Sequence, residues 1–87
     1  MKKTVEKMMR IIRADTGGSR VYADMLLSMM PNSEHKVNIG YWCYKADRDD
    51  FKAILELIAQ SHTDAVFEYE ELVLPFVEEL KKYAQEE

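Results

Sequence analysis

Apolar residues recur at intervals of three and four positions in four stretches of this sequence. Residues at i, i+3, i+4 and i+7 share one face of an α-helix, so each stretch predicts an amphipathic helix. The first stripe consists of Val5, Met8, Met9 and Ile12, and the third of Phe51, Ile54, Leu55 and Ile58. We therefore predict an all-α fold, a small four-helix bundle-like domain. Its expected helices cover residues 4–14, 19–30, 48–61 and 67–85.

Proline and aspartate residues mark the ends of these helices. Pro31 stops the second helix, because proline lacks the backbone N–H that a helix interior needs. Asp47 is a good N-cap for the third helix. Pro75 lies inside the last predicted helix, where it either kinks that helix or starts a second one. Residues 31–47 lack the helical period, and we expect an ordered irregular segment there, with a short helical turn pinned by Trp42.

The length and composition bound the class of protein. The 87 residues suffice for one domain with a thin core, and a hydrophobic content of 47% supplies that core. Cys43 is the one cysteine, so no disulfide can form within the chain. The charged N-terminal stretch is unlike a signal peptide, and no apolar run approaches the roughly 18 residues of a membrane span. We expect a cytoplasmic protein without a membrane partner.

Charge is distributed unevenly along the chain. Residues 1–20 carry six basic and two acidic side chains, whereas residues 64–87 carry eight acidic and two basic ones. Opposite charges at the two ends can attract each other within the fold, or they can offer two different surfaces to partners. We favour attraction within the fold.

The segment DTGGSR, residues 15–20, joins the first two helices and has two interpretations. Backbone N–H groups beside glycine at a helix N-terminus can bind an anion, and the contacts would then come from Arg10, Arg13, Ser19 and Arg20. In the other interpretation the two glycines turn the chain, and Thr16 or Ser19 caps the second helix. We favour the turn, whose motif is Asp15, Thr16 and Gly17, because the spacing of the known phosphate-binding glycine motifs is absent.

Catalytic and metal-binding patterns are weak in this sequence. The histidines, His35 and His62, lie in predicted loops, and neither has the spacing of a metal-binding pair. The glutamate pairs of the last helix are typical of a solvated helix face. We therefore expect no enzymatic activity, no metal and no cofactor. An enzyme would need one of the histidines in a pocket beside Ser19, Cys43 or a carboxylate.

Two groups of residues are candidates for contact with a partner protein. Tyr41, Trp42 and Tyr44 crowd the irregular segment, and tyrosine and tryptophan are common in interface hot spots. Glu70 and Glu71 belong to an acidic face suited to a basic partner. A structural alternative is that Trp42 fills the bundle while the six methionines fill a thin core. The two interpretations are compatible on different faces.

The order of these features resembles a small uncharacterised family of bacterial proteins, common in prophages, plasmids and other mobile elements. The resemblance covers about residues 5–60 and rests on D-T-G-x-S-R between two apolar helices, followed by an aromatic turn that ends in Asp and a third helix. The matching positions are Asp15, Thr16, Gly17, Ser19, Arg20, Leu26, Leu27, Trp42, Asp47, Asp50 and Leu55. The segment MMPNSEHKV, residues 29–37, departs from the family pattern. The resemblance implies no activity, but it implies a mobile-element protein of a bacterial or phage-infected cell.

These observations favour a small non-catalytic protein that acts by binding a host or phage macromolecule, with a protein of unknown identity as its partner. A homodimer is a further arrangement, since a thin core can gain stability by pairing. The alternative is a nucleic-acid or phosphate-binding regulator that uses the basic first helix and the Gly17–Gly18 turn. Nucleic acid is the less favoured partner, because the net charge of the chain is −4 and its second helix offers few polar side chains to read bases.

Overall fold

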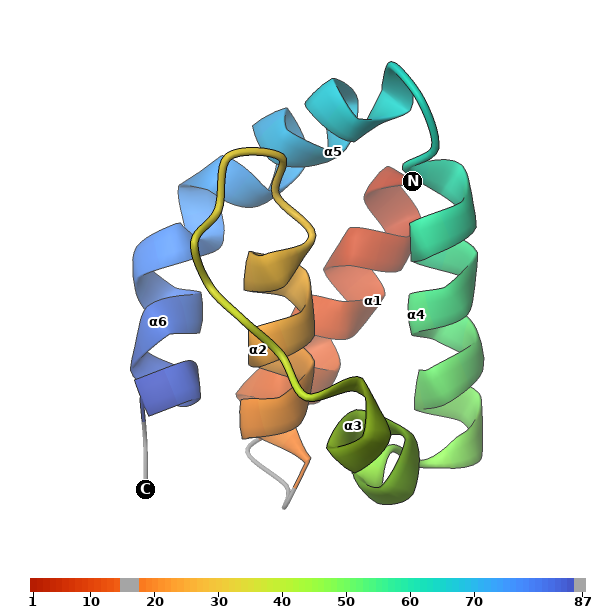
Figure 1. Cartoon of the computed structure of the whole chain (residues 1–87), viewed down its shortest axis with the longest axis vertical. Coiled ribbons are helices and arrows are strands. Elements are labelled where there is room, and N and C mark those ends of the chain that lie inside the picture. The colour runs from red at the N-terminus through yellow and green to blue at the C-terminus, as the bar shows by residue number, and fades with distance from the viewer. Residues whose placement is uncertain (15–17, 86–87) are drawn as a thin grey trace.

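Helices account for all the regular secondary structure in the part of the chain that the computed structural model describes, residues 1–14 and 18–85 (Figure 1). The α-helices are α1 (Lys2–Arg13), α2 (Ser19–Ser28), α3 (Ile39–Lys45), α4 (Arg48–Gln60), α5 (Ala65–Val73) and α6 (Val77–Gln85). A 3-10 turn, η1 (Leu74–Phe76), joins α5 to α6. The all-α fold predicted from the sequence is confirmed.

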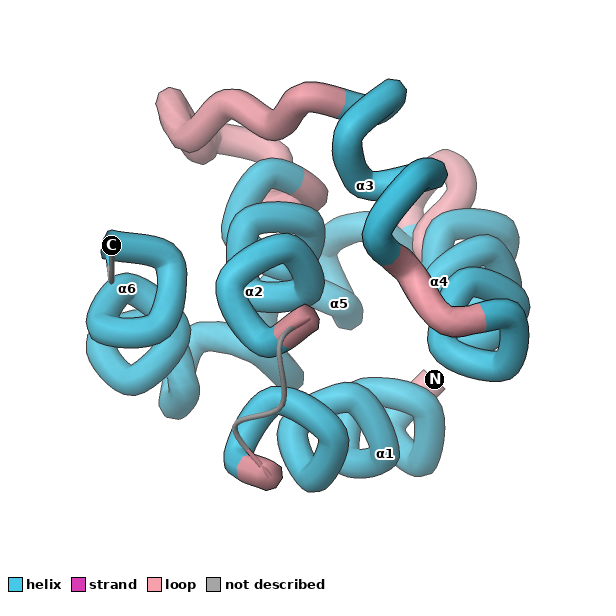
Figure 2. The backbone as a smooth tube through the Cα atoms, turned by 90° about the horizontal axis from the view of Figure 1, so that it is seen from below, coloured by secondary structure: helices cyan, strands magenta, loops and turns pink. Residues whose placement is uncertain are grey.

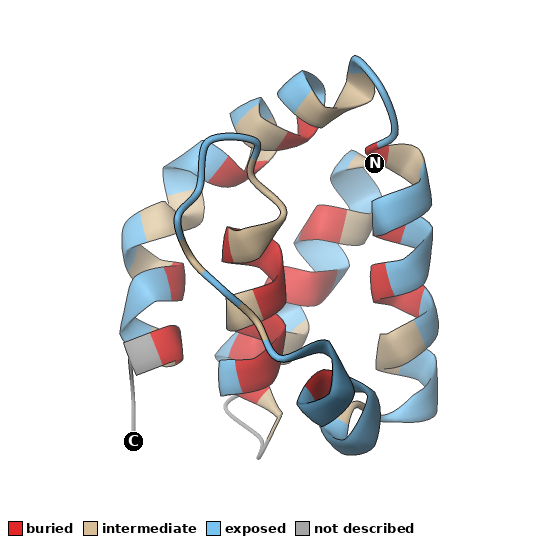
Figure 3. Cartoon of the chain, in the orientation of Figure 1, coloured by how far each residue is buried: buried red, intermediate tan, exposed pale blue. Residues whose placement is uncertain are grey.

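Helix α2 forms the centre of the fold, with α1, α3 and α6 packed around it (Figures 1 and 2). Seven of its ten residues are buried, because apolar side chains occupy nearly its whole circumference. Figure 3 shows the buried band along α2 and on the inner faces of α1, α4 and α6. The core is therefore built around one apolar helix, to which each outer helix contributes one face.

Helix α1 presents its predicted stripe to this core. The stripe residues Val5, Met8, Met9 and Ile12 are buried, and the basic side chains of the helix lie on its exposed side. The periodicity of α1 therefore predicted its inward face correctly. The methionines of α1 and α2 fill the interior, as the structural interpretation of the methionine content expects.

Helix α4 is rotated relative to the prediction. Its buried residues are Ala53, Ile54 and Leu57, whereas Leu55 and Ile58 are 46% and 41% exposed. Two apolar stripes overlap on this helix and share Ile54, and the one that contains the small Ala53 faces α1. A small residue on the contact line lets two helices approach closely. The prediction that Leu55 and Ile58 face the core is therefore wrong.

The segment between α2 and α4 is more regular than predicted. Residues 31–38 are irregular, but α3 follows, and the Asn38 side chain caps it by accepting a hydrogen bond from the Tyr41 N–H at 3.0 Å. Trp42 is the one buried residue of α3, and its ring stacks on Phe51 of α4 with 4.7 Å between the centroids. The short turn expected around Trp42 is thus a two-turn helix pinned by that side chain.

Pro75 splits the last predicted helix in two. The proline lies in η1, where the chain leaves α5 and bends into α6, so that α5 runs across one end of the bundle and α6 runs beside α2 (Figure 1). Tyr69 anchors α5 from the inside: it is fully buried, and its hydroxyl donates a hydrogen bond to the Leu26 carbonyl of α2. Burial raises the pKa of the Tyr69 hydroxyl above its usual value.

Candidate functional site

The described part of the DTGGSR segment faces inward at the start of α2. Residues 15–17 lie outside the described residues, so the roles predicted for Asp15, Thr16 and Gly17 stay predictions. Ser19 is buried, and its hydroxyl donates a hydrogen bond to the Ile12 carbonyl at 2.9 Å. This bond ties the end of α1 to the start of α2, and it uses the hydroxyl proton that would otherwise be donated to an anion. Ser19 is therefore not placed to contact an anion.

Gly18 has a packing role beside this bond. A Cβ atom added at Gly18 would lie 2.9 Å from a ring carbon of Tyr22, closer than side chains tolerate. The Tyr22 ring is buried there, and its hydroxyl accepts a hydrogen bond from the Asp47 N–H at 3.0 Å. Glycine at this position therefore lets the Tyr22 side chain tie α2 to the start of α4.

The arginines predicted to attract an anion differ in their surroundings. Arg13 makes two hydrogen bonds to the Glu79 carboxylate, at 2.7 and 2.9 Å, and its guanidinium lies over the Phe76 ring. These bonds raise the pKa of Arg13 and lower the pKa of Glu79. The pair joins the basic first helix to the acidic last helix, as attraction within the fold predicts. Arg10 and Arg20 are exposed on α1 and α2.

The three aromatic residues predicted to contact a partner separate into one buried and two exposed. Trp42 is only 3% exposed, and its Nε1 finds no acceptor among the described residues, so it is a core residue and not a surface contact. Tyr41 is 52% exposed and Tyr44 is 81% exposed. The alternative that Trp42 fills the bundle is therefore correct, and the tyrosines lie on the outer side of the same short helix.

An exposed apolar surface lies where α3 meets α4. A hollow of about 520 Å³ is lined there by Cys43, Ala46, Arg48, Phe51, Lys52 and Leu55. Ile58 continues the apolar line one helical turn beyond Leu55. We call these seven residues the α3–α4 surface. Sequence reasoning missed it because it assigned Leu55 and Ile58 to the core.

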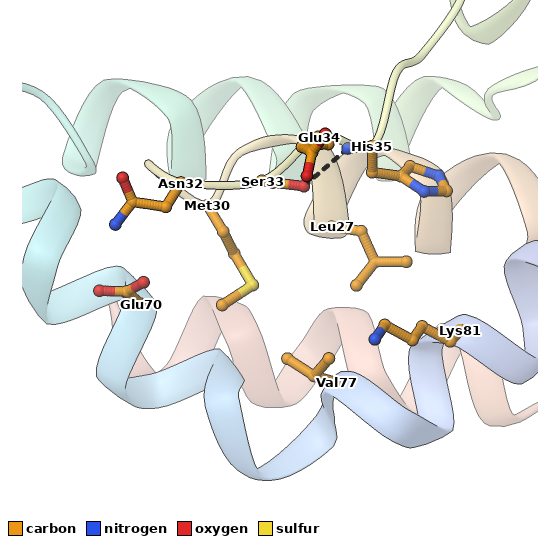
Figure 4. Close-up of a pocket in the computed structure, with 9 residues that line it drawn as sticks. All are labelled: Leu27, Met30, Asn32, Ser33, Glu34, His35, Glu70, Val77 and Lys81. Atoms are coloured by element: carbon orange, nitrogen blue, oxygen red, sulfur yellow. Dashed lines mark hydrogen bonds between the residues drawn. The ribbon is translucent and has the colours of Figure 1, made fainter.

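A second hollow, of about 480 Å³, lies between the irregular segment and the stretch formed by α5, η1 and α6, which we call the α5–α6 arm (Figure 4). We call it the trough, and its lining residues are Leu27, Met30, Asn32, Ser33, Glu34, His35, Glu70, Val77 and Lys81. Figure 4 shows Glu70 and Lys81 toward opposite ends, with Val77 between them and Met30 and Leu27 facing Val77 from the other wall. The trough therefore has an apolar middle and ends of opposite charge.

Residues 32–35 form the roof of the trough, and hydrogen bonds of His35 hold this roof in place. Its Nε2 lies 2.7 Å from an Asp24 carboxylate oxygen, and its backbone N–H donates to the Ser33 hydroxyl at 3.0 Å. These contacts fix residues 33–35 against α2. This contact was not predicted from the sequence, because Asp24 lies on α2, eleven positions before His35 and inside a run of apolar residues.

The predicted acidic pair of α5 does not act as one face. Glu70 is half-buried and lines the trough, whereas Glu71 is exposed and lines a separate hollow with Lys2 and Glu6 of α1. Neighbouring positions on a helix are about 100° apart, so the two carboxylates point toward different elements. Only Glu70 therefore belongs to the trough.

No group of three or more His, Cys, Asp or Glu side chains within residues 1–14 and 18–85 is arranged to hold a metal ion. Over the same residues, no helix has the length and apolar character that a membrane crossing needs. His62 is exposed in the turn after α4, away from Cys43 on α3.

No protein-family model matches the chain, and neither the curated proteins nor the solved structures yield a match. The resemblance to a prophage and mobile-element family therefore stays a prediction.

Proposed function

We propose that this chain is a small non-catalytic protein that binds another protein, and that the α3–α4 surface makes the central contact. The observation that carries this proposal is the exposure of Leu55 and Ile58 on one face of α4, beside the hollow that Phe51 lines. Burying a leucine or isoleucine side chain contributes roughly 1.5–3 kcal/mol. Two such side chains, one turn apart, supply an apolar centre for an interface.

The surroundings of these side chains suit an interface. The Trp42–Phe51 stack lies beneath the surface and holds α3 against α4, so the apolar centre is preformed. Arg48 and Lys52 line the hollow beside the apolar residues. Tyr44, the residue after Cys43 on α3, is an aromatic side chain that is 81% exposed. An apolar centre with a polar rim is the usual anatomy of a protein interface.

The nucleic-acid alternative receives less support from the geometry. Arg13 and Ser19 were proposed to contact an anion, but they are engaged within the fold, Arg13 with Glu79 and Ser19 with the Ile12 carbonyl. The resemblance described above favours a mobile-element protein of the bacterial cytoplasm, and we propose that setting. Self-association through the α3–α4 surface is a separate outcome that the experiment below distinguishes.

The test compares matched charge substitutions on two exposed leucines. Leu55→Glu alters the α3–α4 surface, and Leu74→Glu makes the same change at η1, where the leucine is 56% exposed. Each protein is cross-linked in a nuclease-treated bacterial lysate, and sedimentation of the purified proteins measures self-association. We expect wild type and Leu74→Glu to capture the same partner and Leu55→Glu to lose it.

Two results would overturn the proposal. One is equal capture by Leu55→Glu and wild type. The other is capture that disappears with nuclease, which would favour the nucleic-acid alternative. Sedimentation as a dimer that Leu55→Glu dissociates would replace the foreign partner by a second copy of this chain.

A further inference from the structure

We infer that the trough binds an extended peptide segment that carries a basic residue, a short apolar stretch and an acidic residue in series. The trough lies on a different side of α2 from the α3–α4 surface, so it can be occupied independently of that surface. The class of ligand follows from three features: the charges at its ends, the apolar middle and the distance between the ends.

The charges at the two ends are opposite. Glu70 lies at one end and Lys81 at the other (Figure 4), and the Glu34 carboxylate lies on the roof. The Lys81 Nζ is 3.6 Å from a Glu78 carboxylate oxygen, but both side chains are more than half exposed. Exposed pairs of this kind contribute little, so Lys81 can exchange Glu78 for a carboxylate of a ligand. The trough thus offers an anion for a basic group and a cation for an acidic group.

The middle of the trough is apolar on both walls. Leu27 comes from the end of α2, Met30 from the bend that follows α2, and Val77 from the start of α6. Methionine adapts its shape to different apolar groups because its side chain is unbranched and flexible. The middle therefore accepts small or medium apolar side chains without requiring one exact shape.

The spacing of the charged ends selects an extended ligand. Glu70 and Lys81 are eleven positions apart on the α5–α6 arm, which corresponds to about 16 Å if the arm were straight. The bend at Pro75 shortens this distance. An extended peptide advances roughly 3.3 Å per residue, so about four residues, with the reach of two long side chains, span the ends. A single amino acid is too short to meet both charges.

The roof carries polar side chains that can pair with the backbone of such a segment. Residues 31–38 are irregular, and Asn32 and Ser33 bring side-chain amide and hydroxyl groups to the edge of the trough. The His35–Asp24 contact holds this roof in place. An extended peptide beneath it can satisfy its backbone N–H and C=O groups, which a purely apolar groove would leave unpaired.

The test is a titration of the isotope-labelled full chain with blocked tetrapeptides, followed by the amide chemical shifts. The probes are Lys-Leu-Leu-Glu, Lys-Leu-Leu-Lys, Glu-Leu-Leu-Glu and Lys-Ser-Ser-Glu. We expect Lys-Leu-Leu-Glu to bind about two- to fivefold more tightly than either like-charged peptide, which is the effect of one exposed charge pair. The Lys-Ser-Ser-Glu peptide loses binding because it lacks the apolar middle.

A pair of adjacent substitutions makes the test specific to the trough. Glu70→Lys places a cation at the acidic end, so we expect the preference to change from Lys-Leu-Leu-Glu to Glu-Leu-Leu-Glu. Glu71→Lys makes the same charge change at the neighbouring residue, which lies outside the trough, and we expect the wild-type preference to remain. Circular dichroism checks that both variants keep their helical content.

Three results would overturn the inference. The first is the absence of shift changes around Met30, His35 and Val77 at millimolar Lys-Leu-Leu-Glu. The second is equal binding of all four peptides. The third is the same change of preference in Glu70→Lys and Glu71→Lys, because that would reflect net charge and not the trough.

Discussion

Removing the Tyr69 hydroxyl tests how α5 is anchored to the centre of the fold. In a continuing helix the Leu26 carbonyl would accept from the Met30 N–H, but that N–H bonds the Leu27 carbonyl at 3.3 Å instead. The Tyr69 hydroxyl takes its place as the donor to Leu26. Tyr69→Phe keeps the ring and leaves this buried carbonyl without a partner.

The expected loss in the free energy of unfolding is about 1–3 kcal/mol, the cost of a buried polar group without its hydrogen bond. A loss of about 2 kcal/mol lowers the Tm of a domain this size by roughly 8–16 °C. Urea denaturation followed by circular dichroism measures the free energy, and a thermal scan measures the Tm. The change from tyrosine to phenylalanine keeps the ring and removes one oxygen atom, so the effect reports on the hydroxyl.

Tyr44→Phe is the matched control. It removes the same hydroxyl from a side chain that is 81% exposed, and we expect a change within about 0.5 kcal/mol. Equal stability of Tyr69→Phe and Tyr44→Phe would refute the proposed anchoring of α5 on the Leu26 carbonyl.

Three further predictions concern packing and titration. Gly18→Ala should destabilise the fold by about 1–3 kcal/mol, measured by urea denaturation, because its Cβ would press on the Tyr22 ring. Burial raises the pKa of Tyr22 to about 12, so the unfolded chain releases the Tyr22 proton at a lower pH than the folded chain does. The free energy of unfolding should therefore fall as the pH rises from about 10 to 12. In alkaline denaturation, Tyr22→Phe should flatten that fall, and an unchanged slope would contradict this prediction. Leu57→Ala should cost about 2–5 kcal/mol and Leu55→Ala less than about 1 kcal/mol, and the reverse order in chemical denaturation would contradict the observed rotation of α4.

Local periodicity predicted α1, α2 and α4, because the spacing of apolar residues indicates a helix within one segment, but it predicted only a short turn where α3 forms. It predicted the inward face of α1 but not that of α4, where Ile54 belongs to two overlapping stripes and the neighbouring helix decides between them. Pro75 predicted a kink or a break in the last helix. Which of the two forms depends on where α5 and α6 can pack.

The candidate sites depended on contacts between distant parts of the chain. The sequence allowed Ser19 to contact an anion. Its buried hydrogen bond to the Ile12 carbonyl could not be predicted, because that bond depends on how α1 and α2 meet. The trough combines Glu70 and Lys81 with residues 33–35, which no local spacing relates. The exposure of Tyr41 and Tyr44 was predicted from the sequence, whereas Trp42 is buried because its ring stacks on Phe51.

Hydrogen–deuterium exchange of the captured complex shows where the partner lies on this chain without any substitution. Free protein and complex are compared peptide by peptide along the chain. Binding at the α3–α4 surface predicts slower exchange across α3 and α4, with α1 unchanged. Slower exchange confined to α1 and the start of α2, with α3 and α4 unaffected, would contradict it and favour the basic face as the binding surface.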